Sequence, residues 1–599
     1  MSDQSDSLRH SEVDHASHLS EWIGSLLSSA NYSDITLVVE GERLQAHRLV
    51  LASCCEYFRA LLYGGMREST QKEVELPDAP LKAFKLLLRY IYTGRLSLSG
   101  LKEDMLLDML ELAHQYGFEA LQGAICRYLQ EILSVRNVCA VYDKAQLYSL
   151  DQLSKTCCRF IDRHAALILN SDAFLQLSAG ALNEMLLRDS FYAKEIDIFE
   201  AVHRWYVDKE ELVSEGTMTE ILEKVRLPLM DTGDILGLVR NSKLFSADCL
   251  LDAIKTKKEC LDVDLNYRGQ LIIDENIAVP QHGAQVVTGE QPQELLQPRS
   301  ERSYDGDRGF TRHNIEDENG ITIDLGGMFI INHIVLLLWD KDSRSYSYYI
   351  EVSLNRADWC RIIDHSTYLC RSTQKLYFDP RVVRYIRVVG THNAVNNVFH
   401  LVSLEAMYSS NPFKLSQGIS VPEENVASVE RKACVVEGVS RSRDTLINGN
   451  FTDYDWDSGY TCHQLGSGYI VVQLPQPYMI DSMRLLLWDC DTRSYSYYVE
   501  TSVDKKEWTR VADRTGQLCR SWQILTFEPL PVVFIKIIGT HNTANEVFHC
   551  VHFECPAQVR SLEERSNSPP LDMLPFVPPA DNVAQVPLNR PLDCRRDDL

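Results

Sequence analysis

The chain lacks the features that mark several large classes of protein. No apolar run approaches the roughly 18 residues needed to cross a membrane, and the polar, acidic N-terminus shows no signal peptide. The 17 cysteines include no CxxC pair, and the adjacent pairs Cys54-Cys55 and Cys157-Cys158 have a poor geometry for disulfides. We therefore expect the thiols to be reduced, as in the cytosol or nucleus, and take the protein to be cytoplasmic. We expect no insertion into a membrane.

Positive charge and catalytic motifs are also scarce. Lysine and arginine number 60 against 84 aspartates and glutamates, which gives a net charge of -24 and argues against nucleic acid as the main partner. We find no phosphate-binding glycine loop, no GxSxG and no Cys/His pair in a catalytic context. We therefore expect a protein that is not an enzyme and holds no cofactor.

The chain does contain an internal repeat: a segment of about sixty residues occurs in two copies. Residues 339–400 and 488–549 are identical at 32 of 62 positions, at a constant offset of 149. The two copies are nearly identical in sequence over Trp339–Tyr349 and over Gly390–Asn393, each compared with its counterpart in the second copy. A buried strand can change its sequence as long as it stays apolar. Loops that repeat the same Asp, Arg, Tyr, His and Asn residues are under a more specific constraint, which indicates a duplicated binding module.

Hydrophobic periodicity divides the chain into four parts between two irregular ends. Residues 18–133 combine a strand hairpin (34–46) with helical stripes, and residues 134–258 show almost only helical periodicity. Residues 266–408 and 415–555 change to the alternation of strands. We expect residues 1–17 and the tail, residues 556–599, to be disordered; the tail holds eight of the 21 prolines.

The N-terminal region resembles a BTB/POZ domain, an α+β fold. The resemblance rests on Tyr32–Ile35, Leu44–Ala52, Tyr57-Phe58 and Tyr90–Gly94, and the all-helical region that follows, with Trp205 and Val225–Met230, resembles a BACK domain. The resemblance implies a homodimer. Asp34, His47 and Arg48 match a buried polar cluster near the dimer interface of that family, or they satisfy one another within one subunit.

A short motif within the BTB-like region suggests a partner. BTB domains that bind cullin-3 carry a hydrophobic-x-Glu pattern, which Met66-Arg67-Glu68 matches, and Tyr92 is a plausible second contact. An exposed apolar side chain would fill a pocket on cullin-3, and the carboxylate would set the register. The alternative is an exposed loop with a chance match.

The two repeats resemble discoidin domains, also called coagulation factor 5/8 type C domains, which are all-β, galactose-binding-like jelly rolls. In that family the repeated hairpin lies on the ligand-binding rim, and here its loop is charged and polar, which argues against membrane insertion. Arginines could bind a carboxylate or peptide carbonyl, or Asp340 could pair with Arg344 only to hold the loop. The candidate ligand residues are Asp340, Arg344, Tyr346, His392, Asn393, Asp489, Arg493, Tyr495, His541 and Asn542.

Comparison of the two copies argues against two further sites. His549-Cys550-x-His552-x2-Cys555 resembles a metal cluster, but the first copy lacks its cysteines, and neighbouring strand residues face opposite sides. Secreted discoidin domains close with a disulfide between their ends, where this chain has Cys434 and Cys555 in the second copy only. We expect neither a metal site nor a disulfide there.

These features favour a non-enzymatic adaptor of a cullin-3 ubiquitin ligase. The BTB-like part would bind cullin-3 and dimerise, and the discoidin-like pair would bind a protein substrate. One alternative is a dimeric scaffold that cross-links neuronal, synaptic or vesicle-associated partners without a ligase. A weaker alternative is an intracellular glycan-binding protein.

Overall fold

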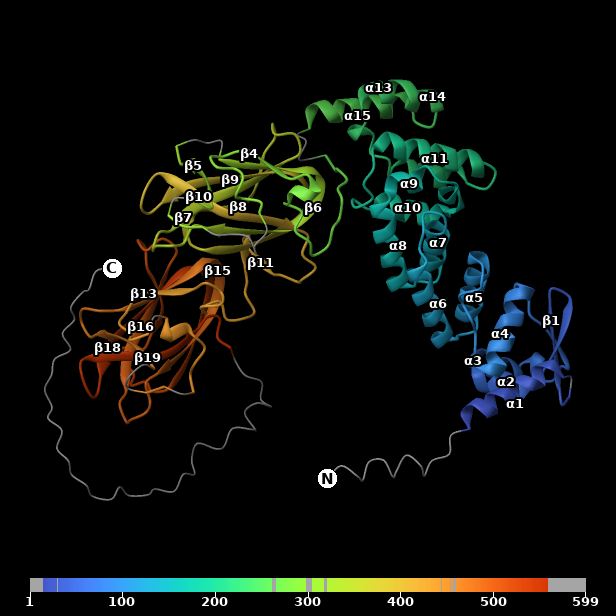
Figure 1. Ribbon diagram of the computed structural model, residues 1–599, viewed down its shortest axis with the longest axis horizontal. Helices are drawn as coiled ribbons and strands as arrows, with labels where there is room; N and C mark the ends of the chain where they lie inside the picture. Colours follow the sequence, from blue (N-terminus) through green and yellow to red (C-terminus); the bar gives the residue numbers. More distant parts are fainter. Residues whose placement is uncertain are drawn as a thin grey trace, which may run out of the picture.

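The computed structural model describes residues 15–558, apart from 30, 261–264, 298–303, 307, 317–319, 443, 453 and 456–458. A mixed domain, a helical domain and two all-β domains follow one another, as predicted (Figure 1). In Figure 1 they form an arch, with the mixed domain (blue) and the second β domain (orange) at its ends. No helix in the described segments is long and apolar enough to cross a membrane.

The N-terminal domain packs helices around a three-stranded sheet of order β2-β1-β3, in which β1 is antiparallel to β2 and parallel to β3. The predicted hairpin is present, but the helix expected over 47–63 is interrupted at Cys55, whose backbone is extended. The first helix begins at Ala16, inside the end expected to be disordered, whereas residues 1–14 and the tail from 559 lie outside the described residues. The elements are α1 (Ala16–Ser28), β1 (Ile35–Val39), β2 (Glu42–Ala46), α2 (Arg48–Cys54), α3 (Glu56–Tyr63), η1 (Arg67–Ser69), β3 (Glu73–Glu75), α4 (Leu81–Thr93), α5 (Glu103–Gln115) and α6 (Glu119–Glu131).

The helical domain shares one hydrophobic core with the N-terminal domain. A single cluster of buried side chains extends from Ile35 in β1 to Leu222 in α12. Trp205, on the apolar face of α11, is fully buried, and its Nε1 donates to the Leu177 carbonyl at 2.9 Å. The continuous core therefore fixes the position of the helices relative to the sheet. The elements are α7 (Val138–Leu147), α8 (Asp151–Arg163), α9 (Ala165–Leu169), η2 (Asp172–Gln176), α10 (Ala179–Leu187), α11 (Glu195–Lys209), α12 (Glu215–Leu222), η3 (Leu227–Leu229), α13 (Thr232–Asp234), η4 (Ile235–Val239), α14 (Arg240–Ser242) and α15 (Ala247–Glu259).

The two β domains share one topology, and each has its own core. The strand order β5-β10-β6-β9-β7-β8 of the first corresponds strand for strand to β14-β19-β15-β18-β16-β17 of the second. In both, a further strand pairs off this path, β4 with β6 and β13 with β15. The described strands are β4 (Gln285–Thr288), β5 (Thr311–Asn314), β6 (Ile321–Leu338), β7 (Tyr346–Ser353), β8 (Cys360–Cys370), β9 (Thr373–Asn393) and β10 (Val398–Met407), then β11 (Leu415–Ser416) and β12 (Ile419–Ser420), then β13 (Cys434–Glu437), β14 (Thr461–Gln464), β15 (Ile470–Leu487), β16 (Tyr495–Ser502), β17 (Thr509–Asp513), β18 (Trp522–Asn542) and β19 (Val547–Glu554).

A buried arginine joins the helical domain to the first β domain. The Arg268 side chain is 2% exposed, and its Nε donates to Glu195 Oε1 at 2.5 Å. Its guanidinium also donates to backbone carbonyls of the helical domain. Two residues later, Gln270 N donates to the Met328 carbonyl and its own carbonyl accepts from Ile330 N, so the linker continues along β6. The linker thereby anchors the β domain to the helices.

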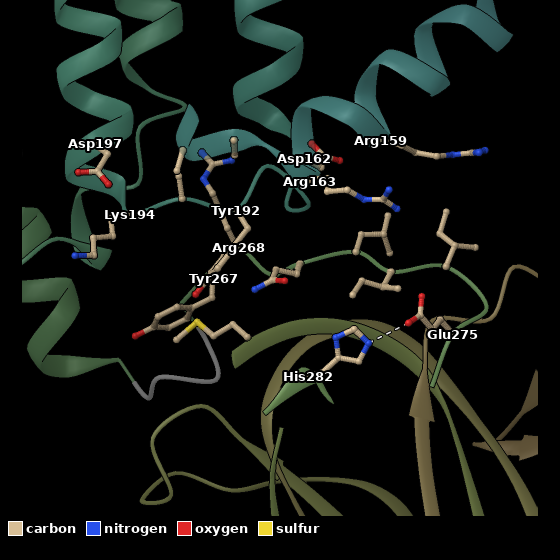
Figure 2. A pocket seen from close by; sticks show the side chains of 18 of the residues that line it. Arg159, Asp162, Arg163, Tyr192, Lys194, Asp197, Tyr267, Arg268, Glu275 and His282 are labelled. Atoms are coloured by element: carbon tan, nitrogen blue, oxygen red, sulfur yellow. Dashed lines mark hydrogen bonds and ion pairs between the residues drawn. The ribbon is translucent and has the colours of Figure 1, made fainter. Parts of the chain in front are cut away.

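A cleft of about 1240 Å³ lies beside this linker. Side chains of the helical domain, including Arg159 and Lys194, line one wall, and His282 lies on the other, paired with Glu275 at 3.0 Å (Figure 2). The cleft is open and carries charges of both signs. We treat it as part of the junction between the two domains.

Candidate functional site

The Met66–Glu68 motif forms a small protruding surface after α3. The Met66 side chain is 46% exposed, and Tyr63, at the end of α3, is exposed beside it in the sequence. Glu68 lies in the short helix η1 and is half-buried. Burial and, secondarily, the Glu68 carboxylate raise the pKa of Tyr57, which places that carboxylate near the α3 surface. An exposed apolar side chain and a carboxylate are thus presented on one short loop.

The guanidinium of Arg48 donates hydrogen bonds to the backbone on both sides of this loop. Its Nη1 donates to the carbonyls of Leu62 at 3.2 Å and Ser69 at 2.9 Å, which lie on either side of Met66 and Glu68 in the sequence. Its Nη2 donates to the Gln71 carbonyl. Asp34 lies on the surface, and its Oδ1 accepts from Arg48 N at 2.8 Å. The polar cluster therefore supports the loop around Met66 within one chain.

Tyr92 belongs to this polar cluster and not to the surface around Met66. It is buried, and its hydroxyl lies 2.8 Å from both the backbone N and the Nδ1 of His47. The other ring nitrogen of His47 lies 3.0 Å from the Asn31 carbonyl. Burial raises the pKa of Tyr92 to about 12. His47 and Tyr92 thus satisfy each other inside the subunit.

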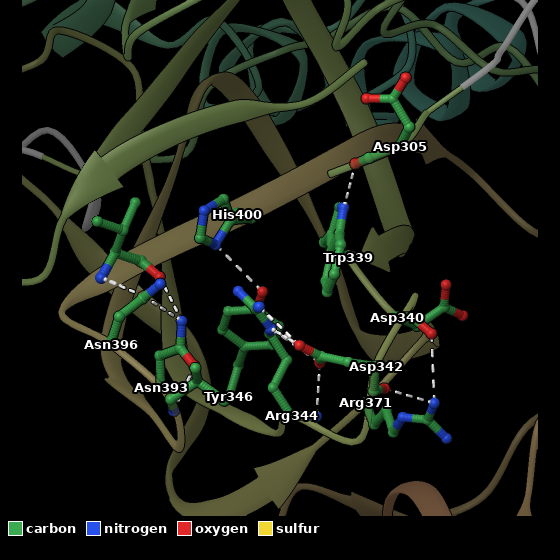
Figure 3. Close-up of polar contacts among 12 residues, drawn as sticks. Asp305, Trp339, Asp340, Asp342, Arg344, Tyr346, Arg371, Asn393, Asn396 and His400 are labelled. Atoms are coloured by element: carbon green, nitrogen blue, oxygen red, sulfur yellow. Dashed lines mark hydrogen bonds and ion pairs between the residues drawn. The ribbon is translucent and has the colours of Figure 1, made fainter. Parts of the chain in front are cut away.

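In the first β domain the repeated loop is held by an internal ion pair (Figure 3). Arg344 donates from Nε and Nη2 to Asp342 at 2.9 and 2.7 Å, and its guanidinium lies 4.2 Å from the centre of the Trp339 ring. The partner of Arg344 is thus Asp342, whereas Asp340 accepts from the Tyr304 hydroxyl at 2.8 Å. The hydrogen bond from Arg344 lowers the pKa of Asp342. Two of the three guanidinium nitrogens of Arg344 therefore bond within the loop.

The repeated tyrosine and asparagine are also bonded internally. Tyr346 is fully buried, with its hydroxyl 3.2 Å from Nδ1 of His400. Asn393 is buried, and its amide donates to Asn396 Oδ1 and the Val398 carbonyl, both at 2.7 Å. These bonds close the turn that carries His392, whose own side chain is exposed.

The second β domain repeats this arrangement contact by contact. Arg493 pairs with Asp491 at 2.7 Å, and Tyr495 lies 3.2 Å from His549. Asn542 makes the same two bonds as its counterpart. Asp489 accepts from the Tyr454 hydroxyl, and His541 is exposed. Of the repeated candidates, the two histidines are the ones whose side chains face solvent in both copies.

A neighbouring segment, which the sequence analysis did not single out, makes the contact between the two β domains. Residues 369–375 of the first domain, here called docking segment 1, lie against β15 of the second. Arg371 N donates to the Pro475 carbonyl at 2.8 Å, and Gln374 Nε2 donates to the same oxygen at 2.7 Å. Residues 518–524 are its counterpart, docking segment 2. The signal was present, because Leu-Cys-Arg-Ser-x-Gln occurs in both copies.

The residues of the apparent metal cluster point to separate partners. His549 bonds Tyr495, and His552 Nε2 lies 3.3 Å from Glu554. Within the described part of the chain, no three His, Cys, Asp or Glu side chains are arranged to hold a metal ion. Cys555 is fully buried, and the Cys434 sulfur accepts from Arg371 Nη1 of the first β domain at 3.1 Å.

Three family models match the chain. They are the BTB/POZ domain at residues 23–133, BTB And C-terminal Kelch (BACK) at residues 138–240, and the F5/8 type C domain at residues 289–403. The second β domain, which has the same strand order as the first, has the same discoidin-like fold. The predicted fold class, BTB followed by BACK and two all-β domains, is thereby confirmed.

Relatives match over most of the chain. It is 57% identical over 560 residues to "BTB/POZ domain-containing protein 9" of Homo sapiens, covering 93% of this chain and 90% of that protein. It is 49% identical over 548 residues to the Drosophila melanogaster protein of the same name, covering 91% and 75%. Over 240 residues it is 30% identical to "Kelch-like protein 21" of Danio rerio, covering 39% and 38%.

Proposed function

Because the chain belongs to the family of BTB/POZ domain-containing protein 9, we propose that it is a substrate-recruiting adaptor of a cullin-3 ubiquitin ligase. In this function it is not an enzyme: the BTB domain binds cullin-3, and the discoidin-like pair binds a protein substrate. The BTB and BACK domains and the similarity to a Kelch-like protein support an adaptor function. The free, buried thiols of Cys157 and Cys370 suit a cytoplasmic protein.

The observation that carries this proposal is the braced loop around Met66. Its apolar side chain is exposed beside a carboxylate, and Arg48 fixes the backbone on both sides. A loop that is ordered before binding loses little conformational entropy when a partner docks. Burial of Met66 in a pocket of cullin-3 would supply the apolar contact, and Glu68 would set the register. Tyr92 would contribute to cullin-3 binding only indirectly, because its hydroxyl bonds His47 at the start of α2.

A binding measurement with purified cullin-3 tests this proposal. We expect Met66→Asp combined with Glu68→Ala to weaken the affinity at least tenfold, because the substitutions remove the apolar contact and the carboxylate together. The matched control is Leu212→Asp with Glu211→Ala, another adjacent apolar and acidic pair, in which Leu212 is 85% exposed. Unchanged affinity in the first double variant would exclude this surface as the cullin-binding site.

The BTB domain is also proposed to form a homodimer. On α1, Trp22 is 66% exposed and Leu19 is exposed on the same side of the helix, three residues earlier. Large exposed apolar side chains of this kind mark protein interfaces. Asp34, His47 and Arg48 are satisfied within one chain, so their contribution to a dimer would be indirect, through the shape of the β2–α2 corner. Sedimentation of Trp22→Asp against the wild type would reveal loss of the dimer.

For the substrate, we propose a protein surface bound at the rims of the β domains. His392 and His541 are exposed there, whereas Arg344 and Arg493 hold the rim loops through Asp342 and Asp491. The other candidate residues of the two loops shape the rims around these two histidines. A dimer would display four such domains, and linked sites can gain about 10²–10⁴ in apparent affinity where the geometry permits.

A further inference from the structure

The two docking segments have the same sequence pattern but different surroundings. Docking segment 1 lies on the second β domain, and its Gln374 is fully buried. In docking segment 2 the corresponding Gln523 is half-buried and Arg520 is exposed. Leu518 is 67% exposed, whereas its counterpart Leu369 is partly buried against Val533 and Phe534 of the second domain. The second β domain therefore covers one copy of the pattern, whereas Leu518 and Arg520 of the other copy are exposed.

The occupant of docking segment 1 is an extended piece of β15, Gln473-Leu474-Pro475-Gln476. The Pro475 carbonyl accepts from Arg371 N and from Gln374 Nε2, and a prolyl residue has no N–H that would need a partner. Gln476 Oε1 accepts from Lys375 N at 2.6 Å, and its Nε2 donates to the Lys375 carbonyl at 2.9 Å. A glutamine side chain thus pairs with both polar groups of one backbone residue.

The first glutamine of the occupant makes a second amide contact. Gln473 Nε2 donates to Ser345 Oγ at 3.0 Å and lies 3.4 Å from the Leu369 carbonyl. The matching groups of the second domain are Ser494 and the Leu518 carbonyl. The contact thus uses an amide that donates at Gln473 and an amide that both donates and accepts at Gln476. A carboxylate at either position could accept but not donate.

We propose that docking segment 2 binds an extended segment of a partner protein with the pattern Gln-apolar-Pro-Gln. It would be held as docking segment 1 holds Gln473–Gln476. Leu518 would cover the apolar side of the partner segment, Gln523 and Arg520 N would bind the prolyl carbonyl, and Ile524 N would bind the second glutamine. This inference rests on the proposed adaptor function, because it names the kind of substrate segment that the discoidin-like pair accepts. It adds a segment-binding site on the second β domain to the two rims proposed above.

The test uses the full chain and a fluorescein-labelled synthetic peptide with the sequence of residues 472–478, followed by fluorescence anisotropy. We expect saturable binding that weakens at least tenfold in Leu518→Asp and in Gln523→Ala. A peptide carrying Gln473→Glu and Gln476→Glu should also bind at least tenfold more weakly. Arg510→Ala, which removes an exposed arginine paired with Asp513, is the control variant and should bind like the wild type.

Because the Leu518 side chain is largely exposed, Leu518→Asp should leave the thermal unfolding temperature unchanged, so a loss of peptide binding would not reflect misfolding. Equal binding of the two peptides, or equal binding by wild type and Leu518→Asp, would overturn the proposal. So would a change of oligomeric state in Leu518→Asp, which would assign the segment to a second copy of the chain. Peptide binding that requires removal of residues 559–599 would assign it to the chain's own C-terminus and likewise overturn it.

Cullin-3 binding, measured on the same variants, separates the two proposals. Leu518→Asp should bind cullin-3 like the wild type. If the peptide fails to bind while Met66→Asp with Glu68→Ala still abolishes cullin-3 binding, the inference fails and the adaptor function stands. If cullin-3 does not bind the wild type, the adaptor function fails, whatever the peptide does.

Discussion

At the residue scale, many residues of the repeated sequence have a structural role, because they pack together or bond one another within each β domain. A Cβ on Gly390 would lie 2.3 Å from the Phe399 ring, and the same holds for Gly539 at 2.4 Å from Phe548. In each copy the glycine N–H also donates to a buried histidine, His313 or His463, at 2.9 Å. Glycine, histidine and aromatic ring therefore form one packed unit that must be repeated together.

Gly390→Ala should accordingly destabilise the first β domain. The added methyl group meets the side chain of a fully buried phenylalanine, and overpacking of this kind costs about 1–3 kcal/mol. We expect a lower unfolding temperature in differential scanning calorimetry. Gly516→Ala is the control, because a Cβ there meets no atom within 4 Å, and it should change stability by less than about 0.5 kcal/mol. Equal effects of the two substitutions would contradict the packing argument.

The buried rim histidines make stability depend on pH. Burial lowers the pKa of His400 and of His549 to about 4, whereas an unfolded histidine titrates near 6.5. As the pH falls from about 6.5 to about 4, the unfolded chain takes up protons that the folded chain does not, so stability decreases. At pH 5 each histidine should cost about 2 kcal/mol relative to pH 7.5.

Urea unfolding at pH 7.5 and pH 5 measures this effect. We expect His400→Gln and His549→Gln to reduce the loss of stability at the lower pH, since glutamine keeps a polar partner for the tyrosine hydroxyl and does not titrate. His392→Gln, at an exposed position, should leave the pH dependence as in the wild type. A pH dependence that is the same in all three variants would contradict the assignment.

At the scale of elements, the linker between the helical and β domains depends on one buried ion pair. Arg268 and Glu195 have side chains 2% and 3% exposed, and burial lowers the pKa of Arg268 despite the attraction of Glu195. Removal of one partner leaves an uncompensated charge in the interior. The linker should therefore lose its attachment to α11 when either residue is neutralised.

Glu195→Gln should destabilise this junction by about 3–5 kcal/mol, the usual cost of breaking a buried pair. Limited proteolysis should then cut the chain near Arg268 faster than in the wild type. Arg43→Ala breaks the exposed pair with Glu73 and should cost about 0–1 kcal/mol, with no new cleavage. Wild-type resistance of Glu195→Gln to the protease would show that the pair does not hold the linker.

Sequence patterns predicted the elements better than their breaks and contacts. The hairpin at residues 34–46 and the helices of residues 18–133 follow from strand alternation and helical periodicity. The break at Cys55 could not be predicted, because cysteine is compatible with a helix. The two loops with the same sequence form the same ion pair, but the partner of Arg344 is Asp342 and not Asp340, which the alternative interpretation named. The repeated pattern Leu-Cys-Arg-Ser-x-Gln marks both docking segments, but the contact of the first with Pro475 depends on tertiary packing and could not be predicted.

At the scale of the whole molecule, the two β domains form a single arm because the first is docked on the second. Arg371 and Gln374 supply hydrogen bonds across this junction, and Leu369 N adds another to the Val503 carbonyl at 3.1 Å. In Figure 1 the arm lies across the arch from the BTB domain. With the proposed function, a substrate held on the arm would be kept apart from the surface around Met66.

Arg371→Ala combined with Gln374→Ala should loosen the arm. We expect a larger radius of gyration in small-angle X-ray scattering, because the two β domains would no longer be held in one orientation. The matched control is Arg520→Ala with Gln523→Ala, the same substitutions in the second copy, which should leave the radius of gyration unchanged. A similar expansion in both double variants would contradict the unequal roles of the copies.

The head-to-tail contact between the β domains also has a direction. β6 of the first domain receives the linker through Gln270, and β15 of the second receives docking segment 1. The contact uses docking segment 1 of the first domain and a different surface, β15, of the second, so it is heterologous, the type of contact that builds rings or open filaments when it is repeated. A further copy of the second domain, grafted after Cys555, would meet docking segment 2 as the second domain now meets docking segment 1, and would place its own copy of the segment at the new end of the arm.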